Sequence, residues 1–147
     1  MNIHAGLVAL RLGGLWRGAL ILGPSGSGKS DLALRLLAEG LRLVADDRAI
    51  VWACGGRLYG RAPDVLRGRI EARGLAVLHA PAVAMAQVAL AVRCEPKGAE
   101  LERLTGEETE SFEGVAVPLL RLRALEASAP AKLRRALLRL GTGAGAP

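Results

Sequence analysis

Aromatic side chains are scarce in this sequence of 147 residues, where Phe, Trp and Tyr together make up 3% of the chain. Proteins that bind single-stranded nucleic acid stack bases on several exposed aromatic rings, and sequence-specific RNA-binding modules do the same. Long apolar runs are missing too, since no segment reaches the roughly 18 uninterrupted apolar residues of a membrane span. The pattern of a secretory signal peptide is also absent. We therefore expect a cytoplasmic protein with neither a nucleic-acid nor a membrane partner.

Cysteine is rare as well. Cys54 and Cys94 lie far apart and outside any C-x-x-C pattern. Two such residues are too few for a metal cage, and free thiols are the state expected in a reducing cytosol.

Acidic residues are outnumbered by basic ones, 14 against 20, which gives a net charge of +6. Most of the surplus is arginine, spread along the whole chain. The densest basic cluster recurs at helical spacing and consists of Lys132, Arg134, Arg135 and Arg139. We interpret this cluster as the solvated face of a helix, because no nucleic-acid recognition module accompanies it.

Apolar residues make up 51% of the chain, which at this length supports one domain with a hydrophobic core. We predict an α/β fold in a single domain over residues 1–140, followed by a frayed, flexible tail at 141–147. Periodicity predicts helices at 30–39 and 130–140. It predicts strands at 3–10, 16–22, 41–45, 49–53, 57–59, 83–92 and 115–122. Residues 63–69 indicate a helix or a loop, and 95–113 is the most loop-like stretch.

Residues 23–30 read GPSGSGKS and fit the pattern G-x-x-x-x-G-K-[S/T] at every fixed position. In this pattern the backbone N–H groups of a glycine-rich loop point at phosphate oxygens, and the positive end of the following helix adds to them. Lys29 would reach the β and γ phosphates, and the Ser30 hydroxyl would bind Mg²⁺. We therefore predict nucleotide binding by Gly23, Pro24, Ser25, Gly26, Ser27, Gly28, Lys29 and Ser30.

Two adjacent carboxylates, Asp46 and Asp47, close the predicted strand at 41–45. Ligands gather at the carboxyl ends of strands in parallel sheets, and an Asp there can hold Mg²⁺ directly or through water. One Asp can bind metal while the other orients or deprotonates an attacking hydroxyl. The alternative is that the pair only caps the next turn. The phosphate loop earlier in the chain favours a functional site.

Several segments together resemble the catalytic domain of HPr kinase/phosphorylase. The run GPSGSGKSDLALRLL followed by GLRLVADD is similar to the family's phosphate loop, helix and strand ending in VADD. The hexapeptide EARGLA at 71–76 resembles the family's E-x-R-G-L-G. ERLTGEET at 102–109, with GVAVP at 114–118, resembles D-R-L-G-x-x-E-E-T followed by G-V-x-V-P. Residues 3–5, IHA, resemble V-H-G, and the overall length is most similar to the short alphaproteobacterial form.

The resemblance implies an ATP- and Mg²⁺-dependent kinase. Its substrate would be a serine of HPr, the small phosphocarrier of phosphotransferase systems, which the modification would regulate. The resemblance also implies a P-loop domain related to phosphoenolpyruvate carboxykinase, and a homo-hexamer.

The resemblance also implies roles for particular residues. The catalytic group would comprise His4, Lys29, Asp46, Asp47 and Arg103. Mg²⁺ would be bound by Ser30, Asp47 and Glu71, and Arg73 would help to hold the nucleotide. Asp47 is the expected acceptor of the serine proton, and Arg103 is expected to contact the transferred phosphate.

The chain departs from the family where P-V-x-P-G-R-N is expected, since residues 127–133 read ASAPAKL instead. That family motif is tied to the reverse, phosphorolytic reaction, so we expect kinase rather than phosphorylase activity. Two alternatives to this interpretation stay open. One is a P-loop kinase of small molecules, and the other is a nucleotide-binding regulator without catalysis.

Overall fold

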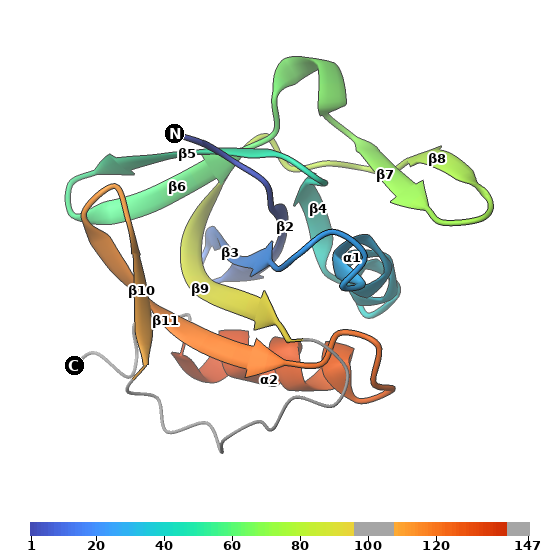
Figure 1. Ribbon diagram of the computed structural model, residues 1–147. Coiled ribbons are helices and arrows are strands. Elements are labelled where there is room, and N and C mark those ends of the chain that lie inside the picture. The colour runs from blue at the N-terminus through green and yellow to red at the C-terminus, as the bar shows by residue number, and fades with distance from the viewer. Residues whose placement is uncertain (96–107, 141–147) are drawn as a thin grey trace.

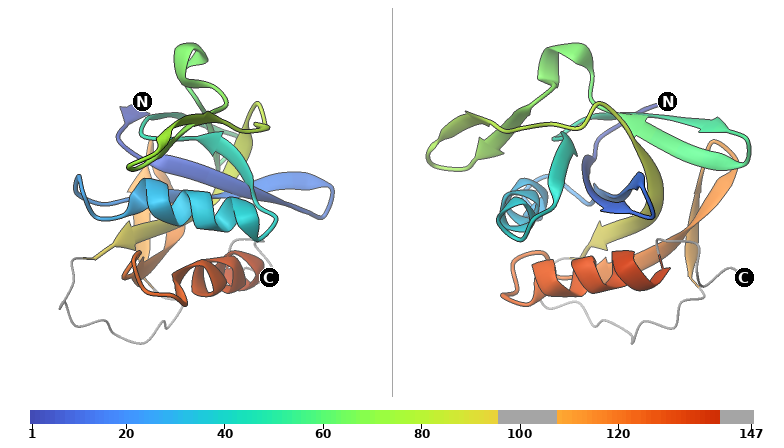
Figure 2. Two further views of the ribbon diagram at one scale, coloured as in Figure 1. Left: turned by 90° about the vertical axis from the view of Figure 1, so that its right-hand side faces the viewer. Right: turned by 180° about the vertical axis from the view of Figure 1, so that it is seen from behind.

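The computed structural model describes residues 1–95 and 108–140 of the chain. Its strands are β1 (Asn2–Ile3), β2 (Gly6–Leu12), β3 (Leu15–Leu22), β4 (Arg42–Ala45), β5 (Ala49–Cys54), β6 (Arg57–Arg61), β7 (Arg69–Ala72), β8 (Ala76–His79), β9 (Ala86–Cys94), β10 (Thr109–Phe112) and β11 (Val115–Leu122). The helices are α1 (Lys29–Ala38), α2 (Ala129–Leu140) and the short 3-10 helix η1 (Asp64–Leu66). They form a mixed α/β domain, in which α1 and α2 flank a curled sheet (Figure 1 and Figure 2).

The main sheet has the strand order β1-β5-β6-β9-β3-β2-β4. Strand β9 is its centre, because it pairs with β3 in parallel along nearly its whole length. On its other side β9 pairs first with β6, antiparallel, and then with β11, parallel. The sheet therefore forks at β9, and the two branches curl toward the same side, as the view from behind shows (Figure 2).

Side chains on the two faces of the sheet build two hydrophobic cores. One core lies under the helices, where Val8 and Ile21 pack with Leu32, Leu36 and other fully buried side chains. The second lies inside the curl, and its members include Leu7, Leu20, Val51, Val88 and Phe112. The period of two along β2 and β3 thus sends neighbouring residues into different cores.

Strand direction brings four segments of the chain to one edge of the sheet. Strand β2 is antiparallel to both of its neighbours, β3 and β4. The residues just before β2 therefore lie at the same edge as those just after β3 and just after β4. The parallel strands β9 and β11 end at this edge too. Residues 4–5, 23–30, 46–47 and 123–126 consequently converge there.

Most predicted elements are confirmed, with shifts of a few residues at their ends. The helix predicted at 30–39 is α1, the hairpin at 49–53 and 57–59 is β5–β6, and residues 63–69 contain η1. The prediction of a loop throughout 95–113 was wrong for β10, which pairs with β11 from Thr109↔Pro118 to Phe112↔Val115. The sequence of β10 does not show the apolar alternation of a strand, because only one of its side chains, that of Phe112, is buried.

The hairpin β7–β8 is a separate two-stranded sheet that projects from the domain (Figure 1). The sequence pattern of Arg69–Ala72 does not by itself indicate a strand. Ile70 of β7 is fully buried against α1, whereas Leu75 and Val77 near the tip are 77% and 61% exposed. The hairpin is therefore anchored at its base and open to solvent at its tip.

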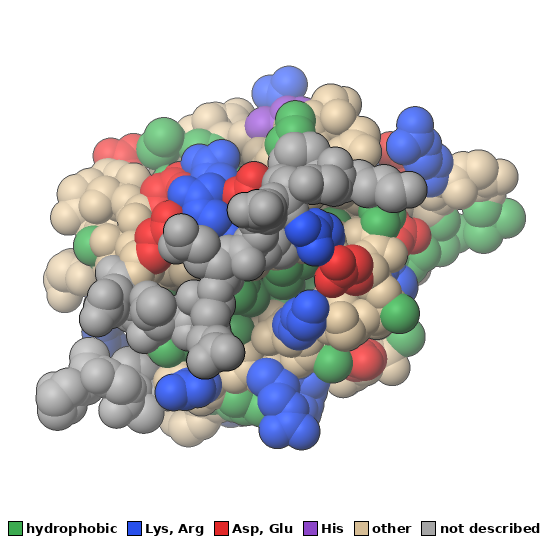
Figure 3. Space-filling view, turned by 60° about the horizontal axis from the view of Figure 1, so that its bottom comes forward, with side chains coloured by type: hydrophobic (Ala, Val, Ile, Leu, Met, Phe, Trp, Pro, Cys, Tyr) green, Lys and Arg blue, Asp and Glu red, His purple; other side chains and the backbone are tan. Residues whose placement is uncertain are grey.

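The basic cluster lies on α2, where all four side chains are exposed, as expected for a solvated helix face. Figure 3 shows basic side chains scattered over this side of the molecule rather than merged into one patch. Neither helix in the described ranges is long and apolar enough to span a membrane. The predicted tail at 141–147 lies outside the described residues.

Candidate active site

The phosphate loop connects the end of β3 to the start of α1. Gly28, the N-cap of α1, has φ +93°, a left-handed conformation that side chains rarely adopt. Gly23 has φ +152°, and a Cβ there would lie 2.8 Å from Ser27 Oγ and 3.1 Å from the carbonyl oxygen of Cys94. A turn closes between them through Ser27 N–H donating to the Pro24 carbonyl over 3.1 Å. The loop conformation therefore depends on glycine at both positions.

Two polar side chains of this loop have features that suit the binding of an anion. Lys29 Nζ folds back and donates to the carbonyl oxygens of Gly23 and Pro24, over 2.8 and 3.0 Å. The ammonium is thus held at the mouth of the loop by two neutral backbone carbonyls. Ser27 Oγ is buried without a hydrogen-bond partner, although buried hydroxyls are normally paired. A phosphate oxygen in the loop would be an acceptor for both groups.

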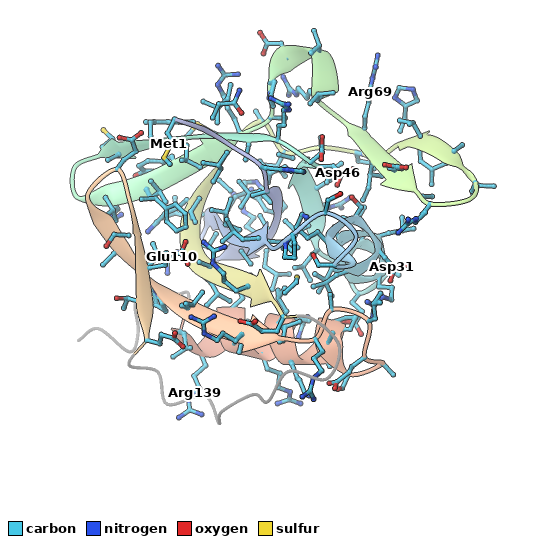
Figure 4. The ribbon with its side chains drawn as sticks, in the orientation of Figure 1. Met1, Asp31, Asp46, Arg69, Glu110 and Arg139 are labelled. Carbon is cyan, nitrogen blue, oxygen red and sulfur yellow. The ribbon has the colours of Figure 1, made fainter. Side chains whose placement is uncertain are left out.

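Asp46 joins the phosphate loop to the β7–β8 hairpin. Its side chain is 8% exposed and is the one acidic side chain counted as buried in the described part of the chain. Oδ1 accepts the Ser30 hydroxyl over 2.8 Å, and Oδ2 accepts the Glu71 backbone N–H over 3.0 Å. Figure 4 shows Asp46 at the end of β4, beside the first turn of α1. One carboxylate thus links α1, β4 and β7.

Asp47 points elsewhere and pairs with the histidine. Its φ of +68° is one of two positive values among the non-glycine residues described. Its Oδ1 lies 2.7 Å from His4 Nε2. The two side chains remain 62% and 59% exposed. Asp47 is therefore accessible to a large substrate, whereas Asp46 is not.

The structure brings five of the predicted catalytic and metal residues to one edge: His4, Lys29, Ser30, Asp46 and Asp47. Glu71 is connected to them through its backbone N–H, while its side chain is exposed. Arg73 lies in the turn of the β7–β8 hairpin, with its side chain exposed. Arg103 lies outside the described residues. The contribution of each of these residues to activity stays a prediction.

The contacts of the two aspartates differ from the predicted set of metal ligands, because Asp46 contacts Ser30 and Asp47 contacts His4. That set placed Asp47 with Ser30, whereas the Ser30 hydroxyl contacts Asp46. No group of three or more His, Cys, Asp or Glu side chains within 1–95 and 108–140 is arranged to hold a metal ion. Ser30 and Asp46 together offer a hydroxyl and carboxylate oxygens, which are the kind of hard oxygen donors that Mg²⁺ binds alongside waters and substrate phosphates.

Two residues against the phosphate loop were not predicted from the sequence. Cys94 ends β9 beside Gly23, and burial raises the pKa of its thiol to about 11. Leu125 lies over Gly28, where an added Cβ would come within 2.8 Å of Leu125 Cδ2. Both are brought there by the parallel pairing of β3, β9 and β11, so no local sequence signal could have revealed them.

A glycine-rich loop, a buried carboxylate on its serine and an exposed Asp–His pair thus lie together at one edge of the curled sheet. The family model of the HPr Serine kinase C-terminal domain matches residues 2–133. The chain therefore belongs to this family of HPr serine kinase domains, and the resemblance noted in its motifs is confirmed.

Individual relatives agree with this assignment. An HPr kinase/phosphorylase from Clostridium tetani is 46% identical over 66 residues, which are 45% of this chain and 22% of the relative. One from Streptococcus equi subsp. zooepidemicus is 38% identical over 116 residues, covering 71% of this chain and 37% of the relative. The matches thus span between 22% and 37% of the length of these relatives.

A solved structure covers nearly all of the chain. The Hpr(Ser) kinase/phosphatase from Coxiella burnetii superposes with a TM-score of 0.76 at 27% sequence identity. The match covers 95% of this chain and 94% of that one. The curled sheet with its two helices is therefore a fold seen in a solved member of the family.

Proposed function

We propose that this domain is a kinase that transfers the γ-phosphoryl group of ATP to a serine of the phosphocarrier HPr. Membership of the HPr serine kinase family supports the type of reaction and the substrate. The single observation that carries the proposal is the position of the exposed Asp47–His4 pair next to the phosphate loop. A protein hydroxyl could reach this pair without entering a closed pocket.

ATP would be held by the loop 23–30. The unpaired Ser27 hydroxyl and the Lys29 ammonium supply donors, and the N-terminus of α1 adds its positive end. Lys29 would exchange the Gly23 and Pro24 carbonyls for phosphate oxygens. The proposal includes the assignment of this loop as a P-loop and the relation to phosphoenolpyruvate carboxykinase. The first rests on the sequence pattern of residues 23–30, and the second rests on the family resemblance.

Mg²⁺ would be held by Ser30, with Asp46 behind it. The carboxylate that already accepts the Ser30 hydroxyl can bind the cation directly or accept hydrogen bonds from its waters. When bound, Mg²⁺ neutralises charge on the β and γ phosphates. This geometry favours Asp46 over Asp47 as the metal carboxylate. Glu71, whose backbone is tied to Asp46, remains a further metal ligand in the proposal.

Asp47 would act as the base. The serine oxygen forms its bond to the γ phosphorus while the bond to the β-phosphate oxygen breaks, and the serine proton passes to the Asp47 carboxylate. His4, 2.7 Å away, would fix the orientation of that carboxylate. Arg103 and Arg73 are proposed as cations for the transferred phosphate and the nucleotide. Phosphoryl transfer depends mainly on positioning and charge neutralisation, which is why several cations are expected.

The remaining expectations from the family resemblance belong to the same proposal. They are a hexameric assembly, a cytoplasmic location and a regulatory effect on a phosphotransferase system. Forward transfer is expected to dominate over phosphorolysis, because residues 127–133 lack the family's P-V-x-P-G-R-N.

A transfer assay tests the proposal. The protein is mixed with Mg-ATP and a cognate HPr, and phosphoserine is detected by the mass shift of HPr. Asp47→Asn is expected to abolish transfer while ATP binding persists. Asp64→Asn is the matched control, since that side chain is 97% exposed and lies in η1, and it should transfer like the wild type.

The outcomes separate the alternatives. ATP binding without transfer to HPr, but with transfer to a small molecule, would identify a small-molecule kinase. ATP binding without any turnover would identify a nucleotide-binding regulator. Transfer that survives in Asp47→Asn would remove this residue from the role of base.

A further inference from the structure

The phosphate loop rests on a residue from a distant part of the chain. Leu125, in the turn between β11 and α2, approaches Gly28 so closely that a Cβ there would lie 2.8 Å from its Cδ2 and 3.1 Å from its Cγ. Ala124 lies on the same side, with its Cβ 3.3 Å from that position. Gly28 has no side-chain cap of its own. The side chains of Leu125 and Ala124 therefore pack against the loop at Gly28.

Leu125 belongs to neither of the two hydrophobic cores. Its side chain is 68% exposed, while neighbouring Ala124 is 1% exposed. Leucines that stabilise a fold are usually buried. The side chain of Leu125 gains little from burial, yet it is in contact with the N-cap of the helix proposed to bind phosphate.

Arg35 of α1 holds the turn in place. Its guanidinium donates to the carbonyl oxygen of Ala124, and also to that of Glu126 over 3.1 Å. Its Nε donates to Asp31 Oδ2 over 2.9 Å, one turn earlier in the helix. The planar guanidinium spans two acceptors at once. Arg35 of α1 thus binds the turn whose Leu125 packs against Gly28, the N-cap of the same helix.

Ion pairs of Glu126 stabilise the turn at 123–126. Glu126 accepts Arg123 over 3.2 Å and Lys132 of α2 over 3.3 Å. Hydrogen bonds to these two cations, that to Arg123 first, lower the pKa of Glu126 from its ordinary value. The Glu126 N–H also donates to the Arg123 carbonyl over 3.2 Å. Segment 123–126 therefore presents Leu125 from a defined turn.

We propose that Leu125, held by Arg35, is a positioning residue that keeps the phosphate loop in its binding conformation. The inference rests on the proposed function in one respect, namely that loop 23–30 binds the phosphates of a nucleotide. A loop that is ordered before binding loses less conformational freedom when the phosphates arrive. Leu125 acts on the phosphate-binding backbone and not on the base or sugar.

The test compares Mg-ATP with inorganic tripolyphosphate, which has the phosphates but no nucleoside. Both are titrated into the full chain by calorimetry. Leu125→Ala is expected to lower the affinity for both ligands by the same factor, about tenfold. Leu125→Met is expected to keep most of the wild-type affinity. Leu15→Ala is the matched control, because Leu15 is also exposed, at 47%, and lies at the opposite end of β3. It should leave both affinities unchanged.

Each outcome decides between explanations. Unchanged affinities in Leu125→Ala, measured with an unchanged melting temperature, would overturn the proposal. A loss confined to ATP would also overturn it, since this would indicate a contact with the nucleoside. If the wild type bound neither ligand, the proposed nucleotide-dependent function would fail instead.

A second variant tests whether the hydrogen bonds from Arg35 to the carbonyls of Ala124 and Glu126 hold Leu125 in place. Arg35→Lys keeps the charge and a partner for Asp31, but one ammonium cannot reproduce the planar fork on two carbonyls. It is expected to weaken tripolyphosphate by a factor similar to that of Leu125→Ala, and the double variant should lose little more than either single one. Fully additive losses of affinity would show that the two residues act independently, and would refute the role of Arg35 in holding Leu125.

Discussion

Substitution of Asp46 separates its structural role from its role toward a cation. In Asp46→Ala the Ser30 hydroxyl and the Glu71 N–H both lose their acceptor. An unpaired buried donor costs about 1–3 kcal/mol. Ser30 is partly exposed and recovers water, so the Glu71 N–H accounts for most of the cost and we expect a total of about 2 kcal/mol. For a domain of this size that corresponds to a fall in melting temperature of roughly 4 to 8 °C.

Asp46→Asn should behave differently. The Asn carbonyl can still accept from the Glu71 N–H, and the Ser30 hydroxyl can rotate to accept from the Asn amide. The loss of stability is then about 1 kcal/mol. The negative charge facing the proposed cation is nevertheless gone. Mg²⁺ raises the ATP affinity of the wild type by some factor, and we expect this factor to be at least about tenfold smaller in Asp46→Asn. The affinity of the variant for ATP in EDTA should equal or exceed that of the wild type.

Scanning calorimetry of both variants, together with ATP titrations in Mg²⁺ and in EDTA, measures these two effects. An Ala variant that melts like the wild type would refute the link between Ser30 and β7. An Asn variant with full Mg²⁺ dependence would show that the cation does not depend on this carboxylate.

Three further predictions follow from the loop and its surroundings. Ser27→Ala removes a buried, unpaired hydroxyl, so it should raise the melting temperature while weakening tripolyphosphate; a lower melting temperature would contradict this. Lys29→Met should weaken Mg-ATP about 100-fold with little change in melting temperature, because its present acceptors are loop carbonyls; unchanged affinity would exclude Lys29 from the site. At pH 8, iodoacetamide should label exposed Cys54 and spare Cys94, whose pKa is raised by burial to about 11. Since this thiol keeps its proton longer in the folded state than its ordinary 9.0 allows, its contribution to stability is complete below pH 9 and falls above it; equal labelling of both thiols would refute the burial.

The glycine-rich loop before α1 and the aspartate pair after β4 could be placed from the sequence because their signals are local. Glycines, Lys29 and Ser30 stand within one short segment between a strand and a helix, and Asp46 directly follows a run of buried residues. His4 was associated with the site only by resemblance. Its position depends on β2 lying between β3 and β4, and strand neighbours of this kind are not encoded in periodicity.

Other features depended on pairings between distant segments. Leu125 reaches Gly28 because β11 runs parallel to β9, and β9 to β3. Strand β10 was not predicted because most of its side chains are polar. It is held by pairing with the adjacent strand β11 and by the ion pair between Arg93 and Glu110. The sequence likewise did not reveal which aspartate contacts Ser30, since adjacent residues in one turn can point in either direction.

The fork of the sheet at β9 has a consequence for how the site comes into being during folding. Strand β3, which leads into the phosphate loop, pairs with β9 some seventy residues later, and the turn over Gly28 arrives only after β11 has joined β9. Such pairings close long loops, and they form slowly compared with hairpins and helices. Early intermediates could contain α1 and the β2–β3 hairpin and still have no formed phosphate cradle. The ability to bind tripolyphosphate would then appear only with the last long-range pairing, and could serve as a kinetic probe of complete folding.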